Sequence, residues 1–526
     1  MISERRDEGR PTGARGGGRA LTRRTLIGGG AGLGIAGLLA ACVDGTPSRA
    51  PSRSPGTTPN GSGTPAGPTS WAELAAATTG AVLRPGSSGW DAARRLQNPR
   101  YDGADPLAIL RVAGADDVVA GLAFARNTKT PVALRSGGHS FTGWSAGGCP
   151  GTGVSPSLVI STADLDDIRL SADGASVTVG PGARLGEVYA RLAAAGRAIG
   201  AGSCGTVGIG GLTLGGGVGV LVRSFGLTCD QLTAATIVTT DGRVHEVSEK
   251  AEPELFWACR GGGGATAGVV TSLTFATRPA PPVLMFELAF PWSSAAQVVA
   301  AWQRWAPEAD PRLWSTLKLL GGSRHSGGPA VTVSGTWTGA KTGADASVDG
   351  FIAATGATPL RHTATQLGYG DAMRTYAGTG ARESEAATSS IGTARLSAGQ
   401  IDVLVGKVGQ ASTVAGLLEG GVSLDALGGA VGAMKPGDTA FPWRSALFTV
   451  QYTAAFGAGA DPAPFDAYVR GFRAAMRPAW GDAAYANYCD AAITDPAAYF
   501  GANTARLHGI ARRADPSGLL SQPHWV

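Results

Sequence analysis

The stretch RSGGHSFTGWSAGG, Arg135 to Gly148, contains two candidate reactive residues with different chemistry, a serine and a histidine. Gly143, Ser145 and Gly147 fit the G-x-S-x-G pattern of a hydrolase nucleophile elbow, in which the serine lies between a strand and a helix. The same stretch is centred on His139, whose neutral imidazole is a nucleophile near neutral pH. Ser145 is followed by Ala-Gly-Gly-Cys-Pro, a poor helix start, so the pattern favours His139 as the reacting residue.

Two further glycine-rich runs lie at Ala201–Gly219 and Arg260–Gly268. Neither contains G-x-x-x-x-G-K-[ST], so neither is a P-loop. Dense glycine permits positive φ and brings backbone N–H groups close to a ligand, and successive N–H groups form concavities that bind phosphate oxygens. Three such loops predict a large, flat, phosphate-bearing cofactor held mostly by backbone; the alternative is three tight structural turns.

Five cysteines follow Cys42, namely Cys149, Cys204, Cys229, Cys259 and Cys489. An odd number leaves at least one cysteine outside any intramolecular disulfide, so one of them requires another explanation. The cysteines and the six histidines form no C-x-x-C or H-E-x-x-H motif, which makes a zinc site unexpected.

An α+β region from about Leu74 to Arg278 must position these loops. Val118, Leu122 and Ala125 share one helical face, and PVALR is predicted to be a strand running into the His139 stretch. TAATIVTTDGRVHEV is predicted to be a hairpin turned by Asp241-Gly242.

From about Val283 to Trp480 the pattern changes to long strands with one apolar and one polar face, such as VTVSGTW and LFTVQYTAAF. Helices such as AAQVVAAWQRWA, with Val298, Trp302 and Trp305 on one stripe, are expected to cover the apolar face. The polar face then either walls a substrate cavity or meets water.

The first 42 residues are predicted to be an export signal. Arg23 and Arg24 form a twin-arginine pair, an apolar run extends from Leu26 to Ala41, and L-A-A-C resembles a lipobox with Cys42 as the lipidated residue. The alternative is a soluble secreted protein that is cleaved elsewhere. Residues 43–70 form a Pro/Ser/Thr/Gly-rich linker that cannot bury a core.

The formal net charge of the chain also limits which molecules it is expected to bind. Removing residues 1–41 takes away seven arginines and three acidic residues, so the formal net charge falls from +5 to +1. A nearly neutral chain argues against nucleic acid, whose phosphates require a concentrated basic face. Apart from the signal, no apolar run is long enough to cross a bilayer, so membrane contact is expected only through a lipid at Cys42.

Several motifs follow one another in order: R-S-G-G-H-S, G-S-C-x-T-V-G-x-G-G-x-x-x-G-G-G-x-G, FWACRGGGG, YANYCD and YFGANTARL. Together they resemble the berberine-bridge-enzyme-like FAD-linked oxidases of the vanillyl-alcohol-oxidase type, over nearly all of residues 75–526. The resemblance implies an α+β fold with a two-part FAD-binding domain of the PCMH type at 71–280. It also implies an antiparallel-sheet substrate domain covered by helices at 281–478, and a C-terminal return to the FAD-binding domain at 479–526.

The same resemblance implies FAD attached through two bonds, from the flavin 8α-methyl group to His139 and from flavin C6 to Cys204. The second bond would account for the odd cysteine. The sequence departs from the family at Gly205, where proline is usual, and at Thr266 and Ala267, where Asn and Phe are common. The other residues predicted to bind the cofactor are Arg135, Ser136, Gly137, Gly138, Ser140, Gly205, Thr206, Val207, Gly210, Gly211, Gly215, Gly216, Gly217, Gly219, Val269 and Asn487.

Two tyrosines are candidates for the catalytic base. Tyr488 is the first, since a phenol can act as a base where neighbours stabilise the phenolate, and Tyr485 is the rival. Gln451, on a polar strand face, matches a family Glu or Gln; an amide cannot take a proton, so it would orient substrate. Val207 matches the position where the family's oxidases carry a small side chain that admits O2 to the flavin.

The sequence therefore predicts an exported FAD oxidase, on the outer face of the membrane or secreted. A base takes the proton of a substrate hydroxyl, hydride passes from its carbon to the flavin, and O2 is reduced to H2O2. The expected donor is a sugar, an oligosaccharide or a secondary-metabolite alcohol. The alternatives are a dehydrogenase with another acceptor, C–N oxidation or oxidative ring closure, a serine hydrolase at Ser145, and a colourless solute-binding lipoprotein.

Overall fold

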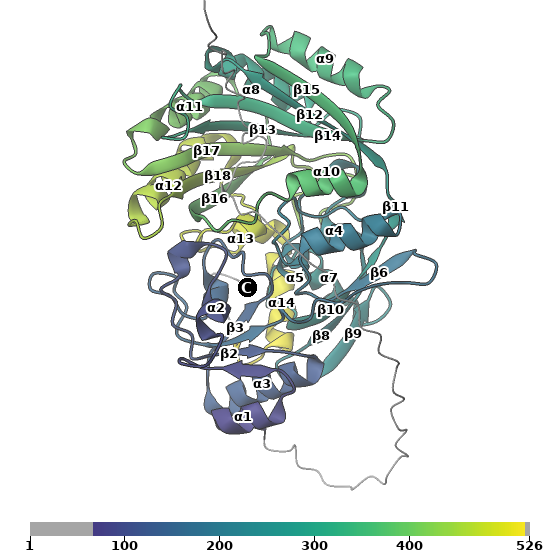
Figure 1. The fold of residues 1–526 in the computed structure, drawn as a ribbon, viewed down its shortest axis with the longest axis vertical. Helices are drawn as coiled ribbons and strands as arrows, with labels where there is room; N and C mark the ends of the chain where they lie inside the picture. The colour runs from purple at the N-terminus through teal and green to yellow at the C-terminus, as the bar shows by residue number, and fades with distance from the viewer. Residues whose placement is uncertain (1–66, 521–526) are drawn as a thin grey trace, which may run out of the picture.

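The computed structural model describes residues 67–520, arranged as two parts that lie one above the other in Figure 1. The lower part combines the N-terminal half of the described chain with its C-terminal segment, and the upper part holds one large sheet with its helices. This arrangement confirms the predicted α+β fold. The predicted export signal and nearly all of the predicted linker lie outside the described residues.

The first sheet of the lower part contains the strand that ends at Arg135. Strands β2, β4 and β3 are parallel, and β1 pairs antiparallel with β2 at the edge. Helix α3 buries Val118, Leu122 and Ala125 against this sheet, as the helical periodicity predicted. The elements are α1 (Trp71–Ala77), β1 (Ala81–Leu83), α2 (Trp90–Arg94), β2 (Ala108–Arg111), α3 (Ala115–Thr128), β3 (Val132–Arg135) and β4 (Leu158–Ser161).

The second sheet of the lower part is antiparallel, in the order β5-β6-β10-β8-β9. Strands β8 and β9 form the predicted hairpin, with Gly242 at φ 89° in the turn. The strands are β5 (Ile168–Leu170), β6 (Ser176–Val179), β8 (Leu232–Val238), β9 (Val244–Ser248) and β10 (Val269–Ala276). Around them lie α4 (Leu185–Ala194), α5 (Ile209–Leu214), α6 (Val222–Phe225), α7 (Pro253–Cys259) and the short pair β7 (Arg197–Ala198) and β11 (Arg278–Pro279).

The upper part is built on a seven-stranded antiparallel sheet, in the order β15-β12-β14-β13-β17-β18-β16. Its strands are β12 (Pro282–Phe290), β13 (Leu313–Gly321), β14 (Ala330–Thr338), β15 (Arg361–Gly368), β16 (Ser384–Gly392), β17 (Leu417–Ala426) and β18 (Phe448–Phe456). Its outer face is covered by α8 (Ala295–Trp305), α9 (Ala344–Thr355), α11 (Ala398–Gly409) and α12 (Ala463–Trp480). Helix α10 (Tyr369–Tyr376) lies on the other side, against α4.

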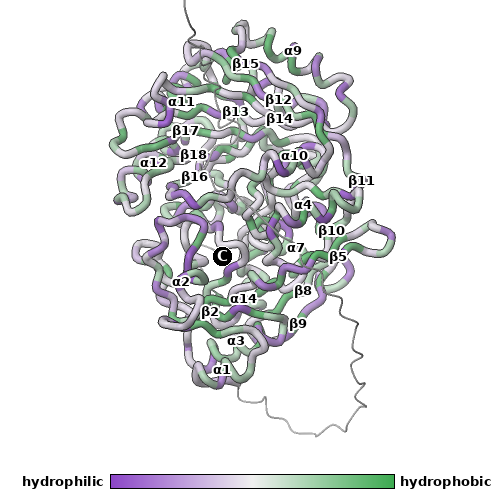
Figure 2. Tube along the Cα trace, viewed as in Figure 1, coloured by the Kyte–Doolittle hydropathy of each residue, from purple (hydrophilic) through white to green (hydrophobic). Residues whose placement is uncertain are grey.

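The two faces of this sheet differ as the sequence predicted. Val331, Val333 and Trp337 point to the outer face and are buried under the helices. Thr336, on the inner face, donates a hydrogen bond to the Val220 carbonyl of the lower part. In Figure 2, green hydrophobic stretches and paler ones both occur along the strands of this sheet. The inner, polar face is therefore turned toward the lower part rather than toward bulk water.

The chain returns to the lower part after α12. Helices α13 (Ala497–Phe500) and α14 (Thr504–Ala514) follow, and α14 packs against α7. Within residues 67–520, no helix is both long enough and apolar enough to span a bilayer.

Buried arginines join the two parts. Arg444, in the loop before β18, binds Asp230 of the lower part through two hydrogen bonds of 2.7 and 2.8 Å. Arg223, in α6, donates to backbone carbonyls of Pro307, Leu313 and other residues of the upper part. Burying a charged guanidinium is costly unless it is hydrogen-bonded or paired with an opposite charge. These contacts therefore hold the inner face of the sheet in place over the lower part.

Candidate functional site

Two of the glycine-rich loops meet backbone to backbone. A Cβ atom on Gly137 would lie 2.2 Å from the Gly208 nitrogen, and one on Gly208 would lie 2.4 Å from the Gly137 nitrogen. Only glycine allows so close an approach. The loop after β3 and the loop before α5, far apart in sequence, therefore form one surface.

The two predicted attachment residues lie on this surface and share one neighbour. His139 Nε2 is 3.0 Å from the Thr206 hydroxyl, and Cys204 Sγ is 3.4 Å from the same hydroxyl. Burial, together with the charge of Arg184, lowers the pKa of His139 to about 4. The imidazole is thus neutral at physiological pH, which is the form that acts as a nucleophile.

The other cysteines differ from Cys204 in their surroundings. All five described cysteines are free thiols, so the structure singles out Cys204 by its place beside His139 and not by cysteine pairing. Burial raises the pKa of Cys229, Cys259 and Cys489 above the ordinary thiol value, which makes them poor nucleophiles.

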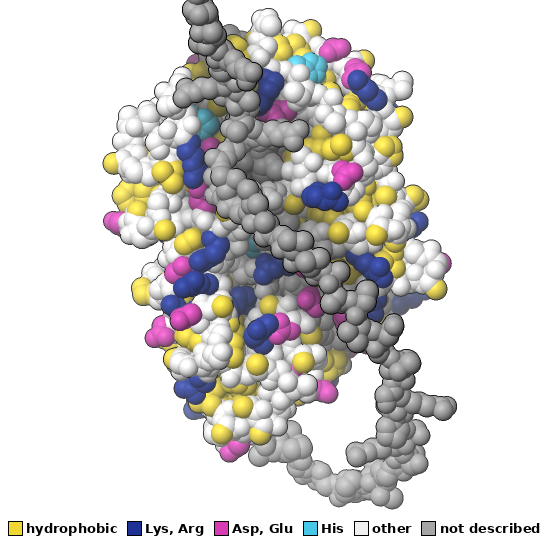
Figure 3. Space-filling model, in the orientation of Figure 1, with side chains coloured by type: hydrophobic (Ala, Val, Ile, Leu, Met, Phe, Trp, Pro, Cys, Tyr) yellow, Lys and Arg dark blue, Asp and Glu magenta, His cyan; other side chains and the backbone are white. Residues whose placement is uncertain are grey.

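The loop after β3 fits an anionic group. Arg135 is 6% exposed, burial lowers its pKa to about 10, and its Nη2 atom has no hydrogen-bond partner within the described chain. A buried guanidinium is costly without a counter-charge, and glycine loops such as this bind phosphates through their N–H groups. The donor set therefore suits the diphosphate of FAD. On the face shown in Figure 3, several Lys and Arg side chains also lie near the junction of the two parts.

Ser145 does not occupy a nucleophile elbow. It lies on a single 3-10 turn, Trp144–Ala146, between Gly143 and Gly147, which both have positive φ. An elbow requires a strand before the serine and a helix after it.

The remaining predicted cofactor residues lie around the same loops. Gly205 donates its N–H to the Ala377 carbonyl at 3.0 Å, and Val207 is a partly buried neighbour of this turn. Gly219 is packed against the Ala201 carbonyl. Val269 begins β10 with its side chain in the hydrophobic core, so only its backbone is available to a ligand.

Tyr485 holds a glycine loop. Its hydroxyl accepts hydrogen bonds from the backbone N–H groups of Gly217 (2.9 Å) and Val218 (3.0 Å) and from Asn487 Nδ2 (3.0 Å). Asn487 also donates to the Leu212 carbonyl at 2.9 Å. Burial raises the pKa of Tyr485 to about 12. With its oxygen surrounded by donors, Tyr485 is an anchor for residues 215–219 and not the base.

Changing Tyr485 to Phe should therefore impair flavin binding rather than chemistry. The change leaves buried N–H groups without an acceptor, at about 1–3 kcal/mol for each group. We expect a lower melting temperature and a lower flavin content, with turnover per bound flavin close to wild type. Thermal unfolding, the ratio of visible to ultraviolet absorbance and steady-state kinetics would measure this. Normal flavin content with lost turnover would contradict the assignment.

The side chain of Tyr488 makes different contacts from that of Tyr485. Its ring packs edge-on to Phe141 (6.0 Å between centroids) and Tyr485 (5.0 Å), and its carbonyl accepts a hydrogen bond from Ser389 on the inner face of β16. Its hydroxyl has no hydrogen-bond partner among the described residues. Burial raises its pKa well above 10, and the negative charges of Asp425 and Glu385 add to the effect.

Asp425 was missed by the sequence analysis. The register places it on the inner face of β17, between Thr316 of β13 and Thr449 of β18. Burial raises its pKa, against the opposing effects of Thr316 and Lys318. The alternation of Val422, Leu424 and Ala426 with Ser423 and Asp425 was the available signal for its face, but only the folded chain brings Asp425 close enough to act on Tyr488.

Gln451 is on the same inner face. It pairs with Ser423 on one side and Ser389 on the other, and it is partly buried. Near it, the buried polar atoms Trp314 Nε1 and Thr449 Oγ1 have no hydrogen-bond partner within residues 67–520. Buried polar atoms without partners are uncommon, and here they suit a polar ligand between sheet and flavin loops.

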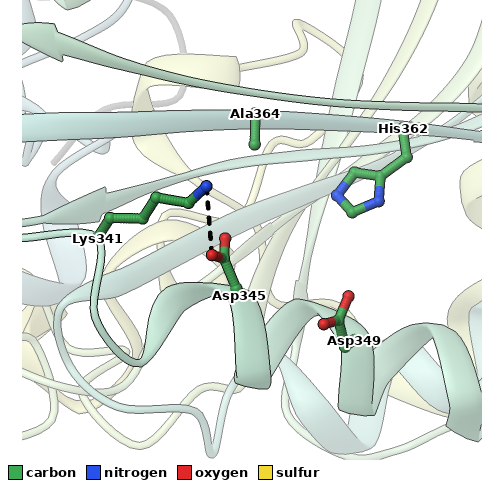
Figure 4. Close-up of a pocket in the computed structure, with 5 residues that line it drawn as sticks. All are labelled: Lys341, Asp345, Asp349, His362 and Ala364. Atoms are coloured by element: carbon green, nitrogen blue, oxygen red, sulfur yellow. Dashed lines mark ion pairs between the residues drawn. The ribbon is translucent and has the colours of Figure 1, made fainter.

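A separate hollow lies on the outside of the upper part, between α9 and the edge strand β15 (Figure 4). Its volume is about 350 Å³, and its lining includes Asp349, His362 and the ion pair of Lys341 with Asp345 (3.3 Å). None of its lining residues belongs to the glycine loops or to the inner face.

Comparisons with known proteins indicate an FAD-linked oxidoreductase. The FAD binding domain family model matches residues 106–248. The uncharacterized FAD-linked oxidoreductase YvdP of Bacillus subtilis is 31% identical over 456 residues, covering 85% of this chain and 98% of that protein. The chitooligosaccharide oxidase of Gibberella zeae is 28% identical, covering 84% and 91%. The solved structure of Physcomitrella patens BBE-like 1 has the same fold, with a TM-score of 0.79 at 24% identity over 87% of this chain and 99% of that one.

Proposed function

The chain belongs to the FAD-linked oxidoreductases of the berberine-bridge-enzyme-like family, and we propose that it is an oxidase of sugar or oligosaccharide hydroxyl groups. The observation that carries the proposal is the position of Tyr488. Its hydroxyl has no hydrogen-bond partner within the described chain and lies between the flavin loops and the charged inner face of the sheet. A base in this position meets a substrate that enters between the two parts.

His139 and Cys204 would hold the flavin covalently. They lie on either side of the Thr206 hydroxyl, so both can approach one edge of a flat ring. The resemblance assigns their bonds to the 8α-methyl group and to C6, both on the benzenoid ring of the flavin. When bound, FAD supplies the acceptor for the hydride and passes the electrons to O2.

Tyr488 and Asp425 would move the proton. The Tyr488 oxygen accepts the proton of the substrate hydroxyl while its own proton passes toward the Asp425 carboxylate, so a phenolate need not persist in a buried site. As the proton leaves, the substrate carbon loses a hydride and becomes a carbonyl. Gln451, which cannot take a proton, orients the substrate through its amide.

The inner face suits a polyhydroxyl substrate. Thr316 and Thr449 lie on either side of Asp425 in one cross-strand row, and Ser423 and Gln451 pair with each other in the next inner-face row, so the face presents hydroxyl and amide groups. A relative that is named as a chitooligosaccharide oxidase supports a sugar. The small side chain of Val207 supports O2 as acceptor; a dehydrogenase with another acceptor, or C–N oxidation, is the second candidate.

The proposal is tested by screening sugars and alcohols for H2O2 release, together with acid precipitation of the protein. We expect the yellow chromophore to stay with the precipitate. His139→Ala and Cys204→Ala should each retain flavin through the other bond, and the double variant should release it. Complete release of flavin from the wild type would refute covalent attachment, and a screen without H2O2 would refute the oxidase.

Covalent attachment of FAD to His139 should also have a characteristic pH dependence. Because the pKa of His139 is lowered to about 4, the imidazole stays neutral as the pH falls from 8 to 5. When apo-protein of Cys204→Ala is incubated with FAD, the yield of acid-stable flavin should stay constant over this range and fall only as the pH nears 4. A fall centred near 6.5, the ordinary histidine value, would contradict the buried neutral state.

We further propose that the protein is exported by a twin-arginine route and anchored by lipid at Cys42, residues that lie outside the described part. Folded export would suit a protein that acquires its flavin before leaving the cytoplasm. Replacing Arg23 and Arg24 with lysine should retain the protein in the cytoplasm, and Cys42→Ser should release it from membranes. An unchanged distribution in fractionated cells would refute this proposal.

A further inference from the structure

One carboxylate on the inner face has no counter-charge. Glu385 of β16 and Glu419 of β17 lie on either side of Ala455 in one cross-strand row, on the face that is turned toward Tyr488. Glu419 accepts a hydrogen bond from His325 at 2.9 Å, and nearby Glu383 is paired with Arg324. The side chain of Glu385 has no hydrogen bond or ion pair to any described residue.

The backbone of Glu385 is nevertheless firmly held. Its N–H donates to Asn98 Oδ1 at 3.3 Å, and its carbonyl accepts hydrogen bonds from Asn98 Nδ2 (2.7 Å) and from Arg100. Arg100 is in turn bound to Asp466 at 2.9 Å by two hydrogen bonds. The free carboxylate is thus placed by a network that joins both parts of the protein, which is the support that a binding residue requires.

The charges around Glu385 leave a negative excess. The charged groups that act on Glu385 are Glu383, Glu419 and the ammonium of Lys318, and Glu385 in turn acts on Tyr488; Arg324 and His325 are already bound to Glu383 and Glu419. Lys318 influences Glu385, Glu419 and Asp425 and forms no ion pair within 4 Å in the described chain. Lys318 is thus shared among three carboxylates, and Glu385 has no counter-charge of its own, so this part of the inner face favours a cationic group over an anionic one.

From this geometry we propose that Glu385 binds a protonated amino group of the substrate, so that the enzyme prefers amino sugars with a free amine to neutral sugars. This inference rests on the proposed sugar oxidation. The ammonium of the substrate would donate a charge-assisted hydrogen bond to the Glu385 carboxylate while the reacting hydroxyl lies at Tyr488. Unpaired polar atoms at Trp314 and Thr449 would bind the remaining hydroxyl groups.

The ionisation of Glu385 predicts how the KM for an amino sugar depends on pH. Burial and the charges of Glu383 and Glu419 raise the pKa of Glu385 to about 7, against the opposing effect of Lys318. Below pH 7 the carboxyl is mostly neutral and binds an ammonium group poorly. The KM for an amino sugar should therefore fall as the pH rises through 7, until the amine itself loses its proton.

The test compares two trisaccharides with β-1,4 links that differ at carbon 2, a glucosamine trimer with amines and cellotriose with hydroxyls. With the flavin-loaded enzyme at pH 7.5, kcat/KM for H2O2 release should be higher for the glucosamine trimer. Glu385→Gln keeps the shape but removes the charge. It should lower kcat/KM roughly 10- to 100-fold for the amine and less than about 3-fold for cellotriose.

Glu383→Gln is the matched control, since it removes a neighbouring carboxylate that Arg324 already pairs, and it should leave the preference for the amine intact. Calorimetric titration gives a readout without turnover: the glucosamine trimer should bind the wild type and lose affinity in Glu385→Gln. Equal losses for both sugars, or no binding of the amine, would overturn the Glu385 assignment. Absence of H2O2 from every sugar, with normal calorimetric binding, would refute the oxidase proposal instead.

Discussion

Tyr488→Phe is expected to lower kcat by about 10²- to 10⁴-fold, the usual contribution of a general base. The variant keeps the ring that packs against Phe141 and Tyr485, so the cavity and the flavin should remain in place. Only the oxygen that would accept the substrate proton is lost. Anaerobic mixing with substrate measures the effect directly, as the rate at which the flavin absorbance near 450 nm disappears.

The variant Asp425→Asn tests whether Asp425 accepts the proton of Tyr488. An amide cannot take the proton of Tyr488, so this variant should also lose flavin reduction, and combining it with Tyr488→Phe should add little because the two groups act as one unit. Tyr485→Phe is the control on the neighbouring tyrosine, which should retain turnover per bound flavin. A Tyr488→Phe enzyme that reduces its flavin at the wild-type rate would eliminate Tyr488 as the base.

Arg444→Met is expected to lower the free energy of unfolding by about 3–5 kcal/mol, because it leaves Asp230 charged and buried without its partner. The side chains of Arg444 and Asp230 are 1% and 8% exposed, so water cannot replace the lost contact. Denaturant unfolding, followed by tryptophan fluorescence, measures the difference.

The double variant Arg444→Met with Asp230→Asn should recover part of this loss, since the uncompensated charge is then absent. Arg506→Met provides the contrast. Its partner Glu254 is about half exposed, and surface ion pairs of this kind contribute less than about 1 kcal/mol. Equal destabilisation by Arg444→Met and Arg506→Met would show that burial of an ion pair does not determine its contribution to the free energy of unfolding.

Local patterns were enough to predict much of the fold. Asp241-Gly242 specifies its hairpin through backbone conformation, and the periodicity of α3 identifies its buried face. The motifs around His139 and Cys204 predicted the attachment of the flavin only through their resemblance to the family, and the two bonds stay a prediction. The structure adds that Thr206 lies between them.

The roles of the two tyrosines could not be separated from sequence. Tyr485 and Tyr488 are three residues apart and both lie in a buried turn, so only the tertiary contacts show that one hydroxyl is surrounded by N–H donors and the other is not. Asp425 and Glu385 come from different strands, and their proximity to Tyr488 depends on strand order. That order is set by long-range pairing, which a local pattern does not encode.

The anchor formed by Tyr485 has a consequence for the way the protein is made. Cys204 and Tyr485 are separated by 281 residues, which a ribosome adds in roughly 15 to 55 s at about 5–20 residues per second. During that interval the glycine loop 215–219 exists without the hydroxyl that holds it. The flavin pocket is therefore completed near the end of translation, and C-terminal truncations that remove Tyr485 should appear as defects in flavin loading, although the attachment residues themselves remain.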